Sequence, residues 1–248
     1  MELRGGIDVS KHQGMIDWRV VKGTGLLHFA ILRAGFGRYA SQKDPQFERN
    51  YAGAKAVDIP VGAYWYSYAL SVEEAREEAQ ACLQVLKGKR FEYPIYYDVE
   101  EGKQSLLGKA ALTEICEAFC DTLEKAGYFA GVYASTYWFM HKLDHARLAS
   151  KYTIWLADYR AGYNKTLKRD IHQYKSSGRI AGISWSVDLD VCTVDFPAII
   201  KAAGLNGYSK TTVPNSTGLK TFTAQASPGD LAQLEQLAKS LNLSYKVE

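Results

Sequence analysis

Two carboxyl groups, on Asp98 and Glu100, follow the apolar run of residues 91–97. Because side chains alternate between the two faces of a strand, Asp98 and Glu100 point the same way and Val99 points to the other side. Acidic groups held that close do not ionise independently, so one tends to keep its proton near neutral pH while its neighbour stays an anion. Cleavage of a glycosidic bond needs this division into acid and anion. An isolated Asp-x-Glu is more often a merely acidic strand end, so this hypothesis depends on the rest of the chain.

Eight short apolar stretches recur along the chain, with turn residues or helical patterns between them. They are residues 6–9, 28–34, 61–66, 93–99, 129–134, 153–157, 171–174 and 187–191. Several are apolar on both faces, as buried parallel strands are, and helical segments separate some of them. The pattern predicts an α/β fold, an irregular TIM-like β/α barrel with eight strands, and it favours a parallel barrel over an antiparallel sandwich. A doubly wound open sheet is the alternative.

Two helices carry clear signals. Ser71 followed by Glu74 is a capping box ahead of residues 72–87. Apolar residues recur at helical spacing between positions 112 and 123, and Gly127 ends the pattern. The last three predicted strands leave little room for helices between them, so we expect fewer than eight outer helices.

The composition changes near residue 205. We predict a catalytic barrel over residues 1–205, a polar linker over 206–218 and a small strand-helix-strand α+β segment over 219–248. About thirty residues of this kind cannot bury a sufficient core alone. The segment is therefore expected to dock on the barrel, to bind the target surface or to mediate self-association.

Charge and cysteine usage exclude several classes of function. The 248 residues carry 30 Lys+Arg against 27 Asp+Glu, which favours neither nucleic acid nor a membrane surface as partner. The four cysteines are scattered and no metal-ligand spacing exists, so we expect buried thiols, no metal and no disulfide framework. The sequence as given starts without a basic segment followed by an apolar core, and no apolar run is long enough to insert in a membrane.

Acidic residues from distant segments are expected to meet at one mouth of the barrel. Parallel barrels place their chemistry at the carboxyl ends of the strands. Asp8 lies near the carboxyl end of the first predicted strand, and Asp188 with Asp190 near that of the last. Together with Asp98 and Glu100 they would form one acidic cluster.

Several motifs, in order, resemble the glycoside hydrolase family 25 muramidases, lysozymes found among phage endolysins and bacterial autolysins. They are GIDVS (6–10) with HQG (12–14), ILRAGFG (31–37), GAY (62–64), YDVE (97–100), GVY (131–133), WLADY (155–159), HQY (172–174) and VDLD (187–190). The resemblance covers roughly residues 5–200. Each motif alone is weak, but their order and spacing together are specific.

The resemblance implies a peptidoglycan hydrolase that cleaves the β-1,4 bond between N-acetylmuramic acid and N-acetylglucosamine without a cofactor. It implies that Glu100 is the general acid that protonates the leaving oxygen. Asp98 would stabilise the positive charge on the sugar, directly or by orienting the N-acetyl oxygen of the substrate as an internal nucleophile. Asp8 and Asp188 match the other two acidic positions of the family site, and would hold hydrogen bonds and set the charge balance.

A further set of residues is expected to contact the substrate. They are Arg33, Tyr64, Tyr133, Trp155, Gln173, Tyr174 and Asp190. Each has a structural alternative, since aromatic side chains also fill the barrel core and Arg33 could simply neutralise buried carboxylates. Asp190 stands where relatives often carry Asn, so its contribution is the least defined.

Two other functions remain to be weighed. A chitinase of the substrate-assisted barrel type is expected to carry acidic residues two and five places before the Asp of the pair, where this chain has Tyr96 and Tyr93. A barrel that only binds glycan would be expected to lose one carboxylate of the pair, yet both are present. With no signal peptide in the sequence given, we expect a phage endolysin that acts on the cell wall from the host cytoplasm, or secretion by a non-signal route.

Overall fold

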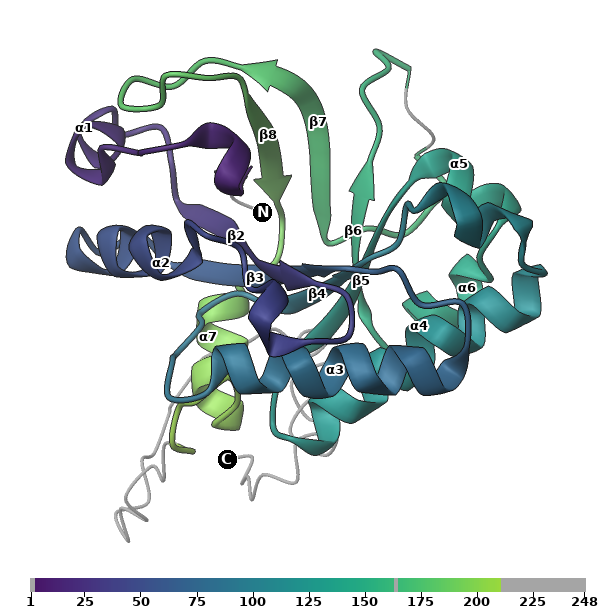
Figure 1. Ribbon diagram of the computed structural model, residues 1–248. Coiled ribbons are helices and arrows are strands. Elements are labelled where there is room, and N and C mark those ends of the chain that lie inside the picture. Colours follow the sequence, from purple (N-terminus) through teal and green to yellow (C-terminus); the bar gives the residue numbers. More distant parts are fainter. Residues whose placement is uncertain (1–2, 163–164, 211–248) are drawn as a thin grey trace, which may run out of the picture. The chain divides into compact units, whose positions relative to one another are not determined.

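The computed structural model describes residues 3–162 and 165–210, in which eight strands close into a barrel in chain order (Figure 1). The strands are β1 (Arg4–Val9), β2 (Phe29–Phe36), β3 (Val61–Tyr66), β4 (Ile95–Asp98), β5 (Ala130–Ser135), β6 (Thr153–Ala157), β7 (Ile171–Gly178) and β8 (Val187–Cys192). Each overlaps one of the eight predicted stretches. The closed barrel confirms the predicted fold and rejects the open sheet.

Seven α-helices lie in the described part of the chain, which agrees with the expectation of fewer than eight. They are α1 (Trp18–Gly23), α2 (Phe47–Ala56), α3 (Val72–Leu86), α4 (Lys109–Lys125), α5 (Thr136–His141), α6 (His145–Ala149) and α7 (Phe196–Ala203). Both clearly signalled helices are confirmed. The hydroxyl of Ser71 accepts a hydrogen bond from the Glu74 N–H at 3.2 Å, which satisfies a free donor at the start of α3.

The last strand departs from the parallel barrel that the sequence predicted. β1 to β7 pair in parallel with their neighbours in that series, whereas β8 runs antiparallel to both β7 and β1. Only residues 179–186 connect β7 to β8, and a parallel return would need a crossover of a dozen residues or more. The two strands therefore form a long hairpin that stands out from the barrel (Figure 1).

Large aromatic rings fill the interior of the barrel because glycines on neighbouring strands leave room for them. A Cβ atom on Gly6 would lie 2.2 Å from Cζ of Phe29, and one on Gly131 would lie 2.5 Å from Cε1 of Tyr96. Outside the barrel, Tyr97 stacks on Phe119 of α4 with ring centroids 3.9 Å apart. The apolar side chains fill the barrel interior below the mouth, and polar side chains lie above them at the mouth.

The beginning of the predicted linker contacts the barrel. The chain divides after Thr211, and two residues of the predicted linker pack on the barrel. Asn206 donates from its side chain to the Tyr93 carbonyl at 2.9 Å and accepts from the Phe129 N–H at 2.7 Å, while the Tyr208 hydroxyl contacts Glu92. The predicted strand-helix-strand segment, 219–248, lies outside the described residues.

Two smaller expectations concern cysteines and membranes. All four cysteines are buried free thiols, as predicted. None of the helices within residues 3–162 and 165–210 combines the length and apolar character that crossing a membrane requires.

Candidate active site

Inward-facing residues from all eight strands form a polar layer at the mouth of the barrel. Their positions follow from the two-residue alternation of each strand, since the residue two places deeper is apolar or glycine in most of them. The layer contains Asp8, Arg33, Tyr64, Asp98, Tyr133, Gln173 and Asp188, with Trp155 and Asp190 beneath its rim. Most of the predicted site residues therefore meet in one place.

Asp98 and Glu100 lie near enough for the charge of Glu100 to act on Asp98. Asp98 is the last residue of β4, and the strand pairing continues for one more residue because the Val99 N–H donates to the Tyr133 carbonyl at 3.0 Å. The Asp98 side chain is buried, with 4% exposure, whereas Glu100 is exposed at the rim. The Oδ1 atom of Asp98 is buried and has no hydrogen-bond partner among the described residues.

The surroundings of this pair favour a retained proton. Burial raises the pKa of Asp98, the charge of Glu100 raises it further, and the Arg33 guanidinium opposes both effects. Partial loss of water around its carboxyl group raises the pKa of Glu100, with help from Asp188 and Glu101. Glu100 is thus both reachable from solvent and inclined to stay protonated, which suits a proton donor.

Arg33 is anchored by a residue that the sequence did not indicate. Its Nε donates to Oδ2 of Asp44 at 2.6 Å, and the Lys11 N–H donates to the same oxygen at 3.0 Å. The Nη2 atom of Arg33 is buried without a hydrogen-bond partner among the described residues. The guanidinium group is therefore held at Nε by Asp44, while Nη2 has no partner among the described residues. The charge of this group acts on Asp98.

Gln173 orients Asp8. Its Nε2 donates to Oδ2 of Asp8 at 2.6 Å, while its Oε1 accepts from the hydroxyls of Tyr133 at 2.9 Å and Tyr159 at 2.6 Å. With both ends bound, the amide cannot turn away from Asp8. Tyr159 was not predicted as a site residue, although it closes the WLADY motif.

The antiparallel course of β8 changes how its acids reach the site. Asp188 lies near the start of β8, opposite Asp8 in register, so it reaches the mouth from the amino end and not from the carboxyl end that we expected. Burial raises the pKa of Asp188 to about 6. The physical cause is the short connection before β8, which reverses the strand.

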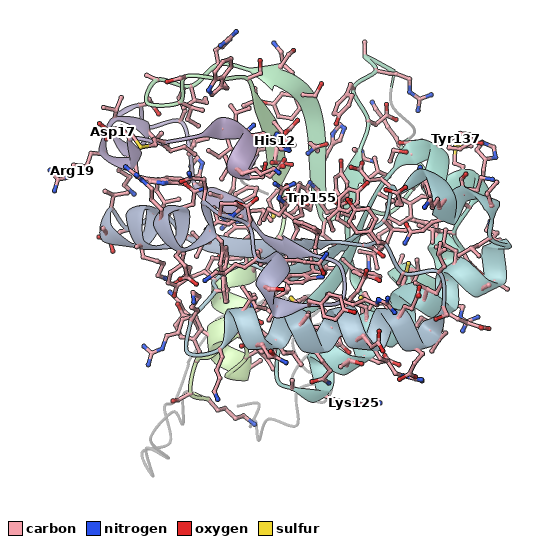
Figure 2. The ribbon with its side chains drawn as sticks, viewed as in Figure 1. His12, Asp17, Arg19, Lys125, Tyr137 and Trp155 are labelled. Atoms are coloured by element: carbon pink, nitrogen blue, oxygen red, sulfur yellow. The ribbon has the colours of Figure 1, made fainter. Side chains whose placement is uncertain are left out.

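Trp155 and Asp190 belong to the floor of the site. The indole N–H of Trp155 donates to Oδ1 of Asp190 at 2.8 Å, and both side chains have 1% exposure. The Trp155 ring packs against Tyr133 and Tyr64, with centroids 4.5 and 6.0 Å away. Figure 2 places Trp155 in the middle of the barrel. These two residues therefore support the site from below.

Tyr174 is not joined to this layer. It is exposed, and its ring lies 6.3 Å from that of His172. Its contact with substrate stays a prediction.

Next to Glu100 in the sequence, Glu101 accepts a hydrogen bond from the Tyr66 hydroxyl at 3.3 Å.

Comparison with known proteins finds related chains. A protein of Escherichia coli O157:H7 named "Uncharacterized protein YegX" is 30% identical over 196 residues, covering 75% of this chain and 68% of that protein. The autolytic lysozyme of Clostridium acetobutylicum is 27% identical over 188 residues, covering 75% of this chain and 54% of its own.

Solved structures share the barrel. The modular autolysin LytC from Streptococcus pneumoniae, in complex with a synthetic peptidoglycan ligand, has a TM-score of 0.68 at 26% identity, covering 77% of this chain. The match spans 46% of LytC, about half its length. The CTP1L endolysin has a TM-score of 0.72 at 21% identity, covering 99% of this chain and 84% of that one, and shows the fold alone.

The family profile for Glycosyl hydrolases family 25 matches residues 7–183, which include the end of β1, all of β2 to β7 and the Asp98/Glu100 pair. This match agrees with the motif order along the chain and with the acidic mouth of the barrel. The chain belongs to family 25 of the glycosyl hydrolases.

Proposed function

We propose that this chain is a muramidase, which hydrolyses the β-1,4 bond between N-acetylmuramic acid and N-acetylglucosamine in bacterial peptidoglycan. The observation that carries the proposal is the arrangement of Asp98 and Glu100, one buried and one exposed, at the mouth of a family 25 barrel. The names of two relatives, an autolytic lysozyme and an autolysin with a peptidoglycan ligand, support the choice of substrate.

In the proposed reaction Glu100 donates its proton to the glycosidic oxygen as the bond to the anomeric carbon breaks. The unpartnered Oδ1 of Asp98 accepts the N–H of the substrate's acetamido group and turns the acetamido oxygen toward the anomeric carbon, where it forms a cyclic intermediate. Glu100, now a carboxylate, takes a proton from water as the water opens that intermediate. Two displacements at one carbon give net retention of configuration.

The other groups of the layer bind and orient the sugar in this proposal. The free Nη2 of Arg33 is placed to donate to a sugar oxygen, and Asp8 and Asp188 accept from sugar hydroxyls. Tyr64 lies close enough to Asp8 for that charge to raise its pKa, so its ring would form part of the same wall. The reaction draws on carboxyl groups alone and needs no cofactor.

Chemical analysis of the cleaved bond tests the proposal. The purified chain is incubated with cell walls, the new reducing ends are reduced with borohydride, and the amino sugar alcohols are identified after hydrolysis. Loss of turbidity with muramicitol as product is the expected result. Glucosaminitol would mean the opposite bond, release of peptides without reducing ends would mean an amidase, and adhesion without cleavage would reject the enzyme. Walls treated with the Glu100→Gln variant provide the blank.

The location of action is also part of the proposal. We propose that the chain acts on the bacterial cell wall, either as an endolysin or as a secreted wall hydrolase. A wall-binding or self-association role for residues 219–248 stays a prediction.

A further inference from the structure

Two buried carboxyl groups meet at the mouth of the barrel, that of Asp8 in the polar layer and that of Asp190 beneath it. Asp190 lies opposite Gly6 in the β1–β8 register, two residues deeper than Asp8, and Gly6 has no side chain to separate the two acids. The two carboxyl groups are within hydrogen-bonding range of each other. Their exposed fractions are 6% for Asp8 and 1% for Asp190.

The donors around this pair are too few for two anions. The Gln173 amide donates to Oδ2 of Asp8, and the Trp155 indole donates to Oδ1 of Asp190. The Oδ2 atom of Asp190 is buried and has no donor among the described residues. None of the ion pairs found within residues 3–162 and 165–210 involves Asp8 or Asp190. Two adjacent buried carboxylates without a cation are strongly disfavoured.

We propose that Asp8 and Asp190 share one proton at neutral pH, and that Asp190 is a positioning residue that donates this proton to Asp8. The shared proton satisfies the otherwise orphaned Oδ2 of Asp190. Asp8 lies nearer the mouth and is bound by Gln173, so it carries the negative charge, while the deeper Asp190 holds the hydrogen. The role of Asp8 toward a sugar rests on the proposed muramidase function, whereas the shared proton does not.

The neighbouring negative charge raises the pKa of the pair, whereas the neutral hydrogen-bond donors lower it. Asp188 on β8 adds a second negative charge, and Tyr64 on β3 is a neutral phenol whose pKa is raised by burial and by Asp8. The indole and the amide are neutral donors. Burial raises the pKa of both carboxyl groups, that of Asp190 to about 8, and the pair titrates as a unit.

Loss of the shared proton has two consequences. As the pH rises through about 8, the pair becomes two adjacent anions that repel each other, so Asp8 is pushed from its position under the substrate. Because the pKa of both groups is raised above the unfolded value, their contribution to folding is full below about pH 4 and is lost as the pH rises through about 8. Activity and stability should therefore both decline on the alkaline side.

Substitution of Asp190 tests the positioning role. In Asp190→Asn the side-chain amide donates an N–H to Asp8, in place of the shared proton, and its oxygen still accepts from Trp155. Asp190→Ala removes both interactions. On soluble muropeptide chains, Asp190→Ala should lower kcat at least tenfold with little change in KM, and Asp190→Asn should restore most of that loss. At alkaline pH the wild-type rate should fall as two protons are lost, the shared proton and that of Glu100. The rate of Asp190→Asn should fall with the loss of one proton, that of Glu100. An Asn variant as slow as the Ala variant, or with the wild-type alkaline limb, overturns the proposal.

A second measurement does not depend on activity. The difference infrared spectrum of wild type minus Asp190→Asn at pH 7 should contain the C=O band of a protonated carboxyl group, because the Asn variant lacks the group that holds the shared proton. The melting temperature of Asp190→Asn relative to wild type should rise steadily from pH 5 to pH 9. Parallel melting curves and an absent band would refute the shared proton, even in a chain that cleaves peptidoglycan. A chain that does not cleave but shows both signals would reject only the proposed function.

Discussion

Replacement of Glu100 by Gln separates the proton donor from the rest of the site. The two side chains have the same shape, and Glu100 is exposed at the rim, so packing is unchanged. Its pKa is raised by loss of water and by the charges of Asp188 and Glu101, which means that its ionised form is disfavoured in the folded chain. The variant should melt at the same temperature as wild type, or slightly above it, at neutral pH.

The expected loss is in rate. Removing a general acid typically costs 10²- to 10⁴-fold, about 3–5 kcal/mol of transition-state stabilisation. The loss should appear in kcat because Glu100 acts on the breaking bond. Reducing ends released per minute from a soluble glycan fragment give kcat and KM, and circular dichroism gives the melting curve.

A substrate with an activated leaving group makes the test sharper. An aryl glycoside whose phenolate leaves without protonation does not need Glu100 for bond breaking, so Glu100→Gln should recover much of its rate on that compound in the first step. Asp98→Asn is the matched control. If Asp98 orients the acetamido group, its variant should be slow on both substrates. Equal losses on both substrates for Glu100→Gln, or a near-normal rate on the natural glycan, would refute the assigned roles.

Two more predictions use the charges and the packing around the site. Asp188→Asn removes a charge that raises the pKa of Glu100, so the acid ionises more readily and the alkaline limb of the rate profile should move to lower pH; an unmoved limb would mean that the two groups are not coupled. Gly131→Ala places a Cβ atom 2.5 Å from Cγ2 of Thr153 and Cε1 of Tyr96, and such overpacking should cost about 1–3 kcal/mol of unfolding free energy. The matching change at Gly108, where no atom lies within 4 Å, should leave the urea midpoint nearly unchanged, and equal effects at both sites would contradict the packing explanation.

The strand positions could be predicted because the signals for each strand lie within its own stretch of sequence. A buried strand is a short apolar run, and turn residues on each side set its limits. The helix at Val72–Leu86 was equally predictable, since Ser71 and Glu74 are a local signal for its start. The direction of β8 was also within reach, because residues 179–186 are too few for a helical crossover. The expectation of a parallel return ignored that length.

Contacts between distant segments carried no comparable signal. Asp44 lies in a loop after β2, and nothing in its sequence surroundings indicates that it anchors Arg33. Trp155 and Asp190 are 35 positions apart, yet the indole N–H donates to the carboxylate at 2.8 Å. Such pairs exist only once the barrel has closed, because closure brings the inner faces of β6 and β8 together.

The sequence by itself determined the barrel, the family and the candidate acids, because strand periodicity and the ordered motifs are properties of the chain read along its length. The tertiary structure decided which of those acids share surroundings. It buried Asp98 and left Glu100 at the rim, brought Asp188 to the mouth from the start of an antiparallel strand, and set Asp190 beneath Asp8. The pKa of a carboxyl group depends on burial and on neighbouring charges, and both are fixed only when distant strands meet.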